Sequence, residues 1–380
     1  MRIVHLCLSC FYIDGAGYQE NYLVRQHVRD GHEVLVIAST ETFDERGGLV
    51  YAEPSAYVGL DGANVIRLPY SKWFPHGLAK KLRIHPNVYK LLKDAQPDAI
   101  LYHGSSGNEI VTVAKYVRDY PKVLLYTDSH ADNNNSARGF ISRYFLHGLF
   151  YRSRLNRALP QIRKILCVSV EAMDFLSKLY GVDEKHLEFF PLGGFVLEEQ
   201  DIVRRRSQTR AELGFNEDMC VFIQTGKMTA RKKLVQTLGV FSRLPGENLR
   251  FLVVGLLGED TREEVASLIE ADPRVKFLGW KSPEDLDNLL CAADAYVQPG
   301  SQSATMQNAL CCGCPVIIDN VRSHQPYLSS GAILVEDENT LSEAFMRAMQ
   351  WNRSEKRGQA LVFARKHLDY VQLSKRVTQE

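Results

Sequence analysis

The chain has 380 residues, of which 45% are hydrophobic and 24% charged, and its formal net charge is +1. That length exceeds one ordinary hydrophobic core and predicts two domains of about 150–200 residues each. The balanced charge gives no indication of a nucleic-acid partner, and no apolar run reaches the ~20 residues of a membrane-spanning helix.

The chain begins with the apolar run MRIVHLCLSCFY, which lacks the long apolar region and the cleavage site of a signal peptide. We therefore expect a first strand there and a cytoplasmic protein. Apolar β-rich runs then alternate with stretches of helical period, which predicts a parallel sheet with crossover helices. The expected strands of the first half are 3–8, 33–38, 99–103, 123–127 and 165–168, and its helices include 18–30 and 87–95.

A glycine-bearing loop, DGAGYQE at 14–20, follows the first expected strand and opens a helix. Gly15 and Gly17 allow the backbone to approach a ligand, and the free N–H groups of a helix start favour an anion. The dinucleotide pattern G-x-G-x-x-G is absent, because position 20 is Glu. A plain strand–helix turn is the alternative interpretation.

The segment YTDSHAD at 126–132 lies at the end of another expected strand. Asp128, His130 and Asp132 alternate, so in an extended backbone they share one face. A histidine there is suited to orienting a substrate hydroxyl or moving a proton. Since no further ligand has a suitable spacing, we expect no metal site, and a lone core histidine is the alternative.

Residues 138–164 carry seven Arg and Lys and no Asp or Glu. Phe140, Tyr144, Phe145 and Leu149 interleave with these cations. A helix of this kind is suited to an anionic membrane surface, and 71–86 would extend the patch. A half-buried helix with an arginine-rich outer face is the alternative.

The polar segment 198–210 has no apolar period and is expected to be a linker. It separates an N-terminal domain, 1–197, from a C-terminal domain, 211–350, and 351–380 is expected to be helical and possibly to cross back to the first domain. The second half repeats the alternation, with expected strands 220–224, 250–254, 275–278, 295–298 and 315–318 and expected helices 232–242, 261–270, 283–292, 304–312 and 340–351.

Two loops of the second half carry candidate binding groups. In GKMTARKK at 226–233, four cations crowd the expected start of a helix, where they oppose the helix dipole unless an anion such as a diphosphate is bound. In PGSQSATMQNALCCGCPV at 299–316, hydroxyl, amide and N–H groups converge, with Ser303 as the expected N-cap. A solvated basic turn and ordinary capping are the alternatives.

The eight cysteines include Cys7 and Cys10 at C-x-x-C spacing, but no second pair lies at zinc spacing. We expect them to be buried small apolar residues or incidental thiols.

In this order, the features resemble glycosyltransferase family 4, which has the GT-B fold, over nearly the full length. The glycine loop with RDGHEVLVIAS at 29–39, VSVEAMDFLSKLYGVDEKHLEFFPLGG at 168–194 and FLGW at 277–280 follow the family order. So do SPEDLDNLLCAADAYVQPG and ALCCGCPVI, while GKMTARKKL resembles the family's G-R-L-x-x-x-K-G phosphate clamp. The resemblance implies an α/β protein with two Rossmann-like doubly wound domains facing across a cleft.

The resemblance also implies roles for single residues. Lys227 and Lys232 would neutralise the donor diphosphate, and His130 would contact the donor sugar near the reacting centre. The remaining donor-side candidates are Gly15, Gly17, Arg231, Gly279, Trp280, Gly300, Ser301, Gln302, Ser303, Thr305 and Asn308, and the acceptor-side candidates are Tyr18, Glu20, Asp128 and Asp132.

One departure concerns two glutamates that the family usually has, eight positions apart. Gly300 and Asn308 stand at those positions. In the family the first glutamate lies against the donor sugar and the second binds the ribose hydroxyls. The departure leaves donor identity and sugar recognition open, and Ser301, Gln302, Ser303 and Thr305 are the nearest polar substitutes.

The resemblance implies a retaining transfer from a nucleotide sugar, with UDP or GDP as the expected nucleotide, to a hydroxyl of a glycan or lipid-linked acceptor in polysaccharide synthesis. No essential metal or other cofactor is expected, because lysines can neutralise the leaving group. Peripheral contact with the inner face of the cytoplasmic membrane through 138–164 is a further expectation. The alternatives are a catalytically degenerate, nucleotide-sugar-binding partner subunit and a sugar epimerase or phosphorylase, and the oligomeric state is not specified.

Overall fold

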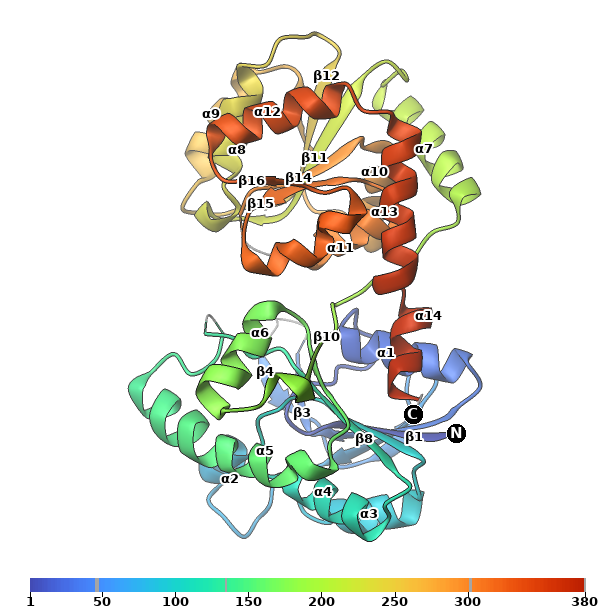
Figure 1. Cartoon of the computed structure of the whole chain (residues 1–380), viewed down its shortest axis with the longest axis vertical. Coiled ribbons are helices and arrows are strands. Elements are labelled where there is room, and N and C mark those ends of the chain that lie inside the picture. The colour runs from blue at the N-terminus through green and yellow to red at the C-terminus, as the bar shows by residue number, and fades with distance from the viewer. Residues whose placement is uncertain (45–47, 134, 301–302, 379–380) are drawn as a thin grey trace. The chain divides into compact units, whose positions relative to one another are not determined.

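The computed structural model describes residues 1–44, 48–133, 135–300 and 303–378, which form two compact α/β units (Figure 1). The first unit comprises Met1–Pro191 and Tyr370–Glu380, and the second comprises Leu192–Asp369. Each unit has a parallel sheet with helices packed on it, which is the predicted doubly wound arrangement.

The sheet of the first unit has the strand order β10-β9-β8-β7-β1-β2-β6-β5. All neighbours pair in parallel except β5 and β6. β7 is buried at every residue, because helices cover both faces of a central parallel strand. The strands are β1 (Arg2–Cys7), β2 (Glu33–Ser39), β5 (Ala56–Val58), β6 (Asn64–Leu68), β7 (Ala99–Tyr102), β8 (Leu124–Ser129), β9 (Ile165–Cys167) and β10 (Leu187–Phe189), and β3 (Glu41–Phe43) and β4 (Leu49–Tyr51) form a separate hairpin.

The helices of the first unit include one stretch of unusual geometry. Within the Arg- and Lys-rich segment 138–164, residues 142–151 form a π-helix, η1, that continues directly into α5. The helices are α1 (Gln19–Arg29), α2 (His76–Leu82), α3 (Val88–Ala95), α4 (Glu109–Asp119), η1 (Ser142–Tyr151), α5 (Arg152–Ala158), η2 (Leu159–Gln161), α6 (Val170–Phe175), η3 (Leu176–Tyr180), η4 (Glu184–His186), α14 (Tyr370–Leu373) and η7 (Ser374–Val377).

The sheet of the second unit is parallel throughout and has the order β13-β12-β11-β14-β15-β16. Along the sheet, each successive strand from β11 to β13 is added toward one edge, and each successive strand from β14 to β16 is added toward the opposite edge. The order therefore reverses between β11 and β14, and ligands of such sheets bind beyond the carboxyl ends of the strands at this point. The strands are β11 (Cys220–Met228), β12 (Leu249–Leu257), β13 (Val275–Phe277), β14 (Ala295–Gln298), β15 (Val316–Asp319) and β16 (Ile333–Val335).

The helices of the second unit pack in two groups (Figure 1). One group contains α8 (Leu234–Ser242), α9 (Arg262–Ala271) and α12 (Glu338–Met349). The other contains α7 (Glu199–Leu213), α10 (Pro283–Ala292), α11 (Ala304–Cys311) and α13 (Arg353–His367). Short helical turns, η5 (Ala230–Lys232) and η6 (Arg322–Ser330), complete the unit.

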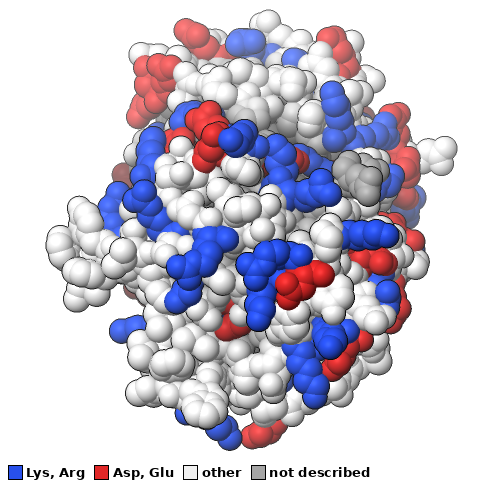
Figure 2. All heavy atoms as spheres, turned by 60° about the horizontal axis from the view of Figure 1, so that its bottom comes forward, with Lys and Arg blue, Asp and Glu red and all other residues white. Residues whose placement is uncertain are grey.

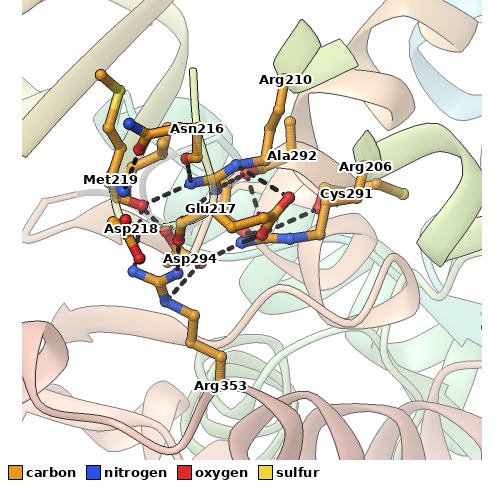
Figure 3. A network of polar contacts seen from close by, with 12 residues as sticks. Arg206, Arg210, Asn216, Glu217, Asp218, Met219, Cys291, Ala292, Asp294 and Arg353 are labelled. Atoms are coloured by element: carbon orange, nitrogen blue, oxygen red, sulfur yellow. Dashed lines mark hydrogen bonds and ion pairs between the residues drawn. The ribbon is translucent and has the colours of Figure 1, made fainter. Parts of the chain in front are cut away.

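The expected linker was wrong, because Glu198 is the N-cap of helix α7 of the second unit and 199–210 lie within that helix. The helix has little apolar surface, and it is held instead by arginines around the buried Asp294. Arg206 and Arg210 of α7 lie 2.8 and 3.4 Å from that carboxylate, and Arg353 of α13 lies 3.3 Å from it. Figure 3 shows all three guanidinium groups pointing toward Asp294. A helix fixed by buried ion pairs has no hydrophobic period, so the sequence pattern concealed it.

The two ends of the second unit also differ from the expected boundaries. The first unit ends at Pro191, and α13 stays in the second unit through His367. Residues after Asp369 return to the first unit, where Tyr370 contacts the ring of Tyr22 at a centroid distance of 5.0 Å.

All eight cysteines are free, and seven of them are buried. Burial raises the pKa of the Cys167 thiol to about 12, so this group packs as a small apolar residue. Within the described part of the chain, no helix combines the length and apolar character needed to cross a membrane.

Candidate active site

The reversal point of the second sheet brings together the loops that follow β11 and β14. Residues 226–233 were expected to open a helix, but β11 continues through Lys227 to Met228. A single turn, η5, then ends at Lys232, and α8 begins only at Leu234. The cations therefore lie on a strand end and a tight turn, and they reach the site without opposing a helix dipole.

Lys232 is the innermost of these cations. Its Nζ donates a 3.2 Å hydrogen bond to Oε1 of Gln298, the last residue of β14, and Gln224 of β11 donates a 2.7 Å bond to the Lys232 carbonyl. Tyr296 also donates to Gln298 Oε1, at 2.6 Å. Burial lowers the pKa of Lys232 to about 8, and within the described part of the chain its ammonium donates to a neutral amide rather than to a carboxylate. Such an ammonium gains a strong partner when a diphosphate arrives.

Gln298, Gln224 and Tyr296 were not predicted as site residues. They lie inside apolar strands, where a polar residue has no periodic signal. The available signal was the position of Gln298 at the carboxyl end of an expected strand.

A pocket of about 860 Å³ lies beside Lys227 at the carboxyl ends of β11, β12 and β13. The exposed side chain of Lys227 lines it, as do the rings of Phe277 and Trp280. Trp280 is 69% exposed, so an aromatic face is available for stacking. Gly279 adopts φ +66°, which turns the chain after β13, and its carbonyl accepts from the Gly255 amide at 2.8 Å. The predicted candidates Lys227, Gly279 and Trp280 thus share one pocket.

Gly300 has a structural reason to lack a side chain. A Cβ atom on Gly300 would lie 2.1 Å from the carbonyl oxygen of Arg231, so the loop after β14 packs directly on the η5 backbone. No glutamate fits there in this arrangement. The exposed Arg231 side chain lies on the same turn. Ser301 and Gln302 fall outside the described residues.

Helix α11 begins after this loop with Ser303 as its N-cap, as predicted. The Ser303 hydroxyl accepts a 3.2 Å bond from the Thr305 amide. Asn308, one turn further on, donates a 2.6 Å bond to the Asp287 carboxylate on α10. Its side-chain amide nitrogen is therefore engaged within the second unit.

The glycine loop of the first unit is held firmly on α1. The buried Asp61 carboxylate accepts from Tyr12 at 2.8 Å and from Asn21 at 2.5 Å, and it pairs with Arg25. Arg25 also donates to the Ala16 carbonyl at 2.6 Å. Gly15 has φ +73°, a conformation that residues with side chains rarely adopt, whereas a Cβ atom on Gly17 would lie 3.0 Å from the Tyr22 hydroxyl. Of the acceptor-side candidates beside the loop, Tyr18 is 51% exposed and Glu20 is buried.

Asp128, His130 and Asp132 do not form the shared face that their alternation predicted. β8 ends at Ser129, so the extended backbone stops before His130. Asp128 is turned inward and pairs with His103 at 2.5 Å. Asp132 instead accepts from the Asn135 amide at 2.9 Å within a turn. His130 is half-buried, and none of the described residues forms a hydrogen bond with its Nε2.

The pairing partner of Asp128 begins a chain of buried histidines that sequence inspection missed. His5, His27 and His103 are separated by up to 98 positions and join only in the folded unit. Among the described residues, no group of three or more His, Cys, Asp or Glu is placed to hold a metal ion. The expectation of a metal-independent reaction stays a prediction.

Comparison with known families covers both units. Residues 13–193 match the family model described as Glycosyltransferase Family 4, and residues 205–360 match the model Glycosyl transferases group 1. With two Rossmann-like units and a pocket beside Lys227 at the carboxyl ends of β11, β12 and β13, the chain is a nucleotide-sugar glycosyltransferase of the GT-B fold. It belongs to glycosyltransferase family 4, as the sequence resemblance predicted.

Solved structures of low sequence identity share this fold over the full chain. HepE of Anabaena in complex with UDP is 15% identical, with 100% of this chain and 98% of that one covered and a TM-score of 0.65. Sucrose-phosphate synthase of Thermosynechococcus elongatus is 16% identical, with coverage of 100% and 98% and a TM-score of 0.64. WaaG, a glycosyltransferase involved in lipopolysaccharide biosynthesis, is 15% identical, with coverage of 99% and 100% and a TM-score of 0.60. No curated protein matches the sequence.

Proposed function

We propose that this glycosyltransferase transfers a sugar from a UDP-sugar, with retention of configuration, to a hydroxyl of a glycan or lipid-linked acceptor in cell-surface polysaccharide synthesis. The observation that carries the proposal is the position of Lys232, whose half-buried ammonium donates to the neutral Gln298 amide and pairs with no carboxylate of the described residues. A diphosphate supplies the missing negative charge. UDP is favoured as the nucleotide because HepE, which shares the fold, has been crystallised with UDP-glucose.

In the proposed donor pose, the base stacks on Trp280, and Lys227 and Lys232 bind the diphosphate. As the bond between the anomeric carbon and the diphosphate oxygen breaks, the two ammonium groups stabilise the leaving negative charge. The acceptor oxygen bonds to the anomeric carbon on the same face, and its proton passes to a donor phosphate oxygen. No carboxylate nucleophile is required, which agrees with Gly300 in place of a glutamate.

The test removes both cations in Lys227→Ala/Lys232→Ala and measures UDP binding by calorimetry and sugar transfer by product analysis. Each phosphate-binding cation contributes a charge-assisted interaction of about 1.5–3 kcal/mol, so we expect at least a hundredfold loss of UDP affinity and no detectable transfer. Lys90→Ala/Lys93→Ala removes two exposed cations from α3 and serves as the matched control. Unchanged turnover in the Lys227/Lys232 variant would contradict the proposal.

The second candidate, a nucleotide-sugar-binding partner subunit without turnover, is favoured by one observation. Asn308 donates to Asp287 at 2.6 Å, so the position that binds ribose hydroxyls in the family is occupied by an internal contact. UDP-sugar binding without transfer to any acceptor would support this candidate. GDP-sugar binding in place of UDP-sugar binding would correct only the nucleotide.

We also propose that residues 138–164 contact an anionic membrane surface, where a lipid-linked acceptor would be found. Ile141 is 75% exposed and Phe140 71%, and three further apolar side chains of the segment, Tyr144, Phe145 and Leu149, are each more than half exposed. Large apolar side chains on an exposed helix lose water contact when they enter a lipid interface.

Arg138, Arg143, Arg152 and Arg154 lie next to these apolar side chains along the chain, and further cations lie elsewhere on the first unit. A hollow of about 370 Å³ between α3, α4 and α5 is lined by Lys115, Arg118 and Arg157 and by the ring of Tyr89. In Figure 2, Lys and Arg side chains gather on the face in view, with fewer Asp and Glu between them. Cations beside an apolar surface suit the phosphate groups of anionic lipids.

A further inference from the structure

A continuous chain of hydrogen bonds crosses the interior of the first unit. Asp128 Oδ2 lies 2.5 Å from Nδ1 of His103, whose Nε2 lies 2.9 Å from Nδ1 of His5. Nε2 of His5 lies 2.9 Å from Nδ1 of His27, and Nε2 of His27 lies 3.1 Å from the carbonyl oxygen of Ser374. All three imidazoles are fully buried, and every ring nitrogen has a partner.

The groups at the two ends determine how many protons this chain holds. Four hydrogen bonds each need one proton, and the Ser374 carbonyl can only accept. Three neutral imidazoles supply only three protons. One additional proton must therefore be present, either on one of the three imidazoles or on the Asp128 carboxylate.

The electrostatic environment agrees with this count. Burial lowers the pKa of His103, but the Asp128 carboxylate, together with Cys7 and Glu20, raises that pKa to about 10. Burial lowers the pKa of His27 to about 4 and that of His5 well below its usual range. The extra proton therefore resides on His103, while His5 and His27 are neutral and carry their proton on Nε2.

Without the Ser374 carbonyl, the same chain needs one proton fewer. His27 can then carry its proton on Nδ1 and donate to His5, which donates to His103, which donates to Asp128. Three protons satisfy all three remaining bonds. The charge at the Asp128 end thus depends on an acceptor at the opposite end.

We infer that the buried chain of His27, His5 and His103 couples docking of the C-terminal segment, residues 370–378, to the net charge at the end of β8, and that these histidines are positioning residues for the adjacent His130. With the segment docked, Asp128 and His103 form a neutral ion pair. With the segment detached, the neutral histidine chain leaves Asp128 with an uncompensated negative charge two residues from His130.

The C-terminal segment is well placed for such a role in the chain. It follows α13 of the second unit directly, so it is one of the two covalent connections between the units. On the first unit, Ser374 Oγ donates to Asp30 of α1 at 3.2 Å, and Arg376 pairs with Glu188 of β10. Other titratable groups act on the histidine chain from the packed elements, namely Cys7, Cys10, Glu20, Asp30, His32 and His130.

The consequence for catalysis rests on the proposed function, because it concerns an anionic donor. A neutral Asp128–His103 pair repels a diphosphate less than a lone carboxylate does. Docking of the segment would therefore favour binding of an anionic donor, and donor binding would favour docking by the same factor.

The test measures hydrogen exchange of residues 370–378 by mass spectrometry in the full-length protein from pH 6 to pH 9, corrected for intrinsic exchange rates. The docked state holds one more proton, so docking weakens as pH rises. We expect the opening constant of the segment to increase with pH, by at most tenfold per pH unit. His5→Phe removes the middle of the chain and should abolish this dependence, whereas His76→Phe on α2 should retain it.

A flat pH profile in the wild type, or an unchanged slope in His5→Phe, would overturn the inference. If His5→Phe does not fold, ¹⁵N NMR of histidine-labelled wild type decides. The expected spectrum shows both His103 nitrogens protonated and His5 and His27 protonated on Nε2, and a His5 proton on Nδ1 would refute the inference. UDP affinity of the full-length protein is measured in parallel. Because UDP binding tests the proposed function directly, loss of UDP binding would contradict that function, whereas a flat pH profile with UDP binding retained would contradict only this inference.

Discussion

The chemical properties of single residues in the site depend on their burial and on their hydrogen-bond partners. Lys232 differs from the exposed Lys227 because it lies half-buried at the reversal point of the sheet, where its ammonium donates to Gln298. Burial disfavours its charged form and lowers its pKa to about 8. Binding of a diphosphate favours the charged form again, so donor binding and protonation of Lys232 are linked.

This linkage predicts a pH dependence of UDP affinity. The donor binds the protonated lysine, so its contribution is fully present below about pH 8 and is lost as pH rises through the pKa of the free protein. Calorimetry between pH 7 and pH 10 should show affinity falling by at most tenfold per pH unit above pH 8. Lys232→Arg keeps its charge throughout this range and should flatten the profile. An equally steep profile in that variant would assign the titration to another group.

Gly300 is required by backbone packing rather than by chain flexibility. Any other residue at this position would place its Cβ atom 2.1 Å from the Arg231 carbonyl oxygen, and glycine avoids this clash. We predict that Gly300→Ala shifts the loop, lowers the stability of the second unit by about 1–3 kcal/mol and weakens UDP binding at least tenfold. Thermal unfolding and calorimetry measure both effects.

Gly239→Ala on helix α8 is the matched control, because a Cβ there meets no neighbouring atom. That change should preserve UDP binding and stabilise the helix slightly. If Gly300→Ala bound UDP like the wild type, the close packing of the two loops would not matter for the donor site.

At the scale of elements, helix α7 shows how a polar segment can still be structural. Arg206 and Arg210 are buried against Asp294, which also accepts a 2.8 Å bond from the Val221 amide at the start of β11. This network lies at the amino ends of the strands, opposite to the ligand edge. It therefore serves the fold of the second unit and not the reaction.

Removal of the central carboxylate should be costly. Asp294→Asn leaves two buried guanidinium groups without their main counter-charge, and we expect a loss of about 3–5 kcal/mol in the free energy of unfolding of the second unit. Chemical denaturation measures the loss, and Asp218→Asn, at an exposed position, is the control. UDP affinity of the folded Asp294→Asn protein should stay unchanged, and a small stability effect would show that other groups hold α7.

At the scale of the whole molecule, the net charge of +1 does not reveal how unevenly the charges are distributed over the surface. Cations and apolar side chains are concentrated along residues 138–164, so the protein can contact an anionic surface although its total charge is nearly balanced. Attraction of this kind is screened by salt over ~10 Å at 0.1 M ionic strength.

We predict that the protein co-sediments with vesicles containing anionic lipid at low salt and is released as salt increases. Phe140→Ser/Phe145→Ser removes apolar contact area and should reduce the bound fraction severalfold without lowering the unfolding temperature. Val362→Ser changes an equally exposed apolar residue of the second unit and is the control. Absence of co-sedimentation by the wild type would favour a soluble acceptor.

Local sequence patterns were sufficient for the two parallel sheets, because buried parallel strands read as continuous apolar runs bounded by turns. They also predicted that Ser303 caps a helix and that Lys227, Gly279 and Trp280 lie near the carboxyl ends of strands, where ligand sites of doubly wound sheets lie. Donor binding by these three residues stays a prediction. Family matches then agreed with the resemblance seen in those same loops.

Other features depend on contacts between residues far apart in the chain. The burial of Lys232 against Gln298, the close approach of Gly300 to Arg231 and the inward turn of Asp128 have no local signature. Helix α7 and the His5–His27–His103 chain likewise exist only because tertiary packing excludes water around polar groups. Periodicity records which residues avoid water, whereas the partners of buried polar groups are decided when distant strands and helices meet.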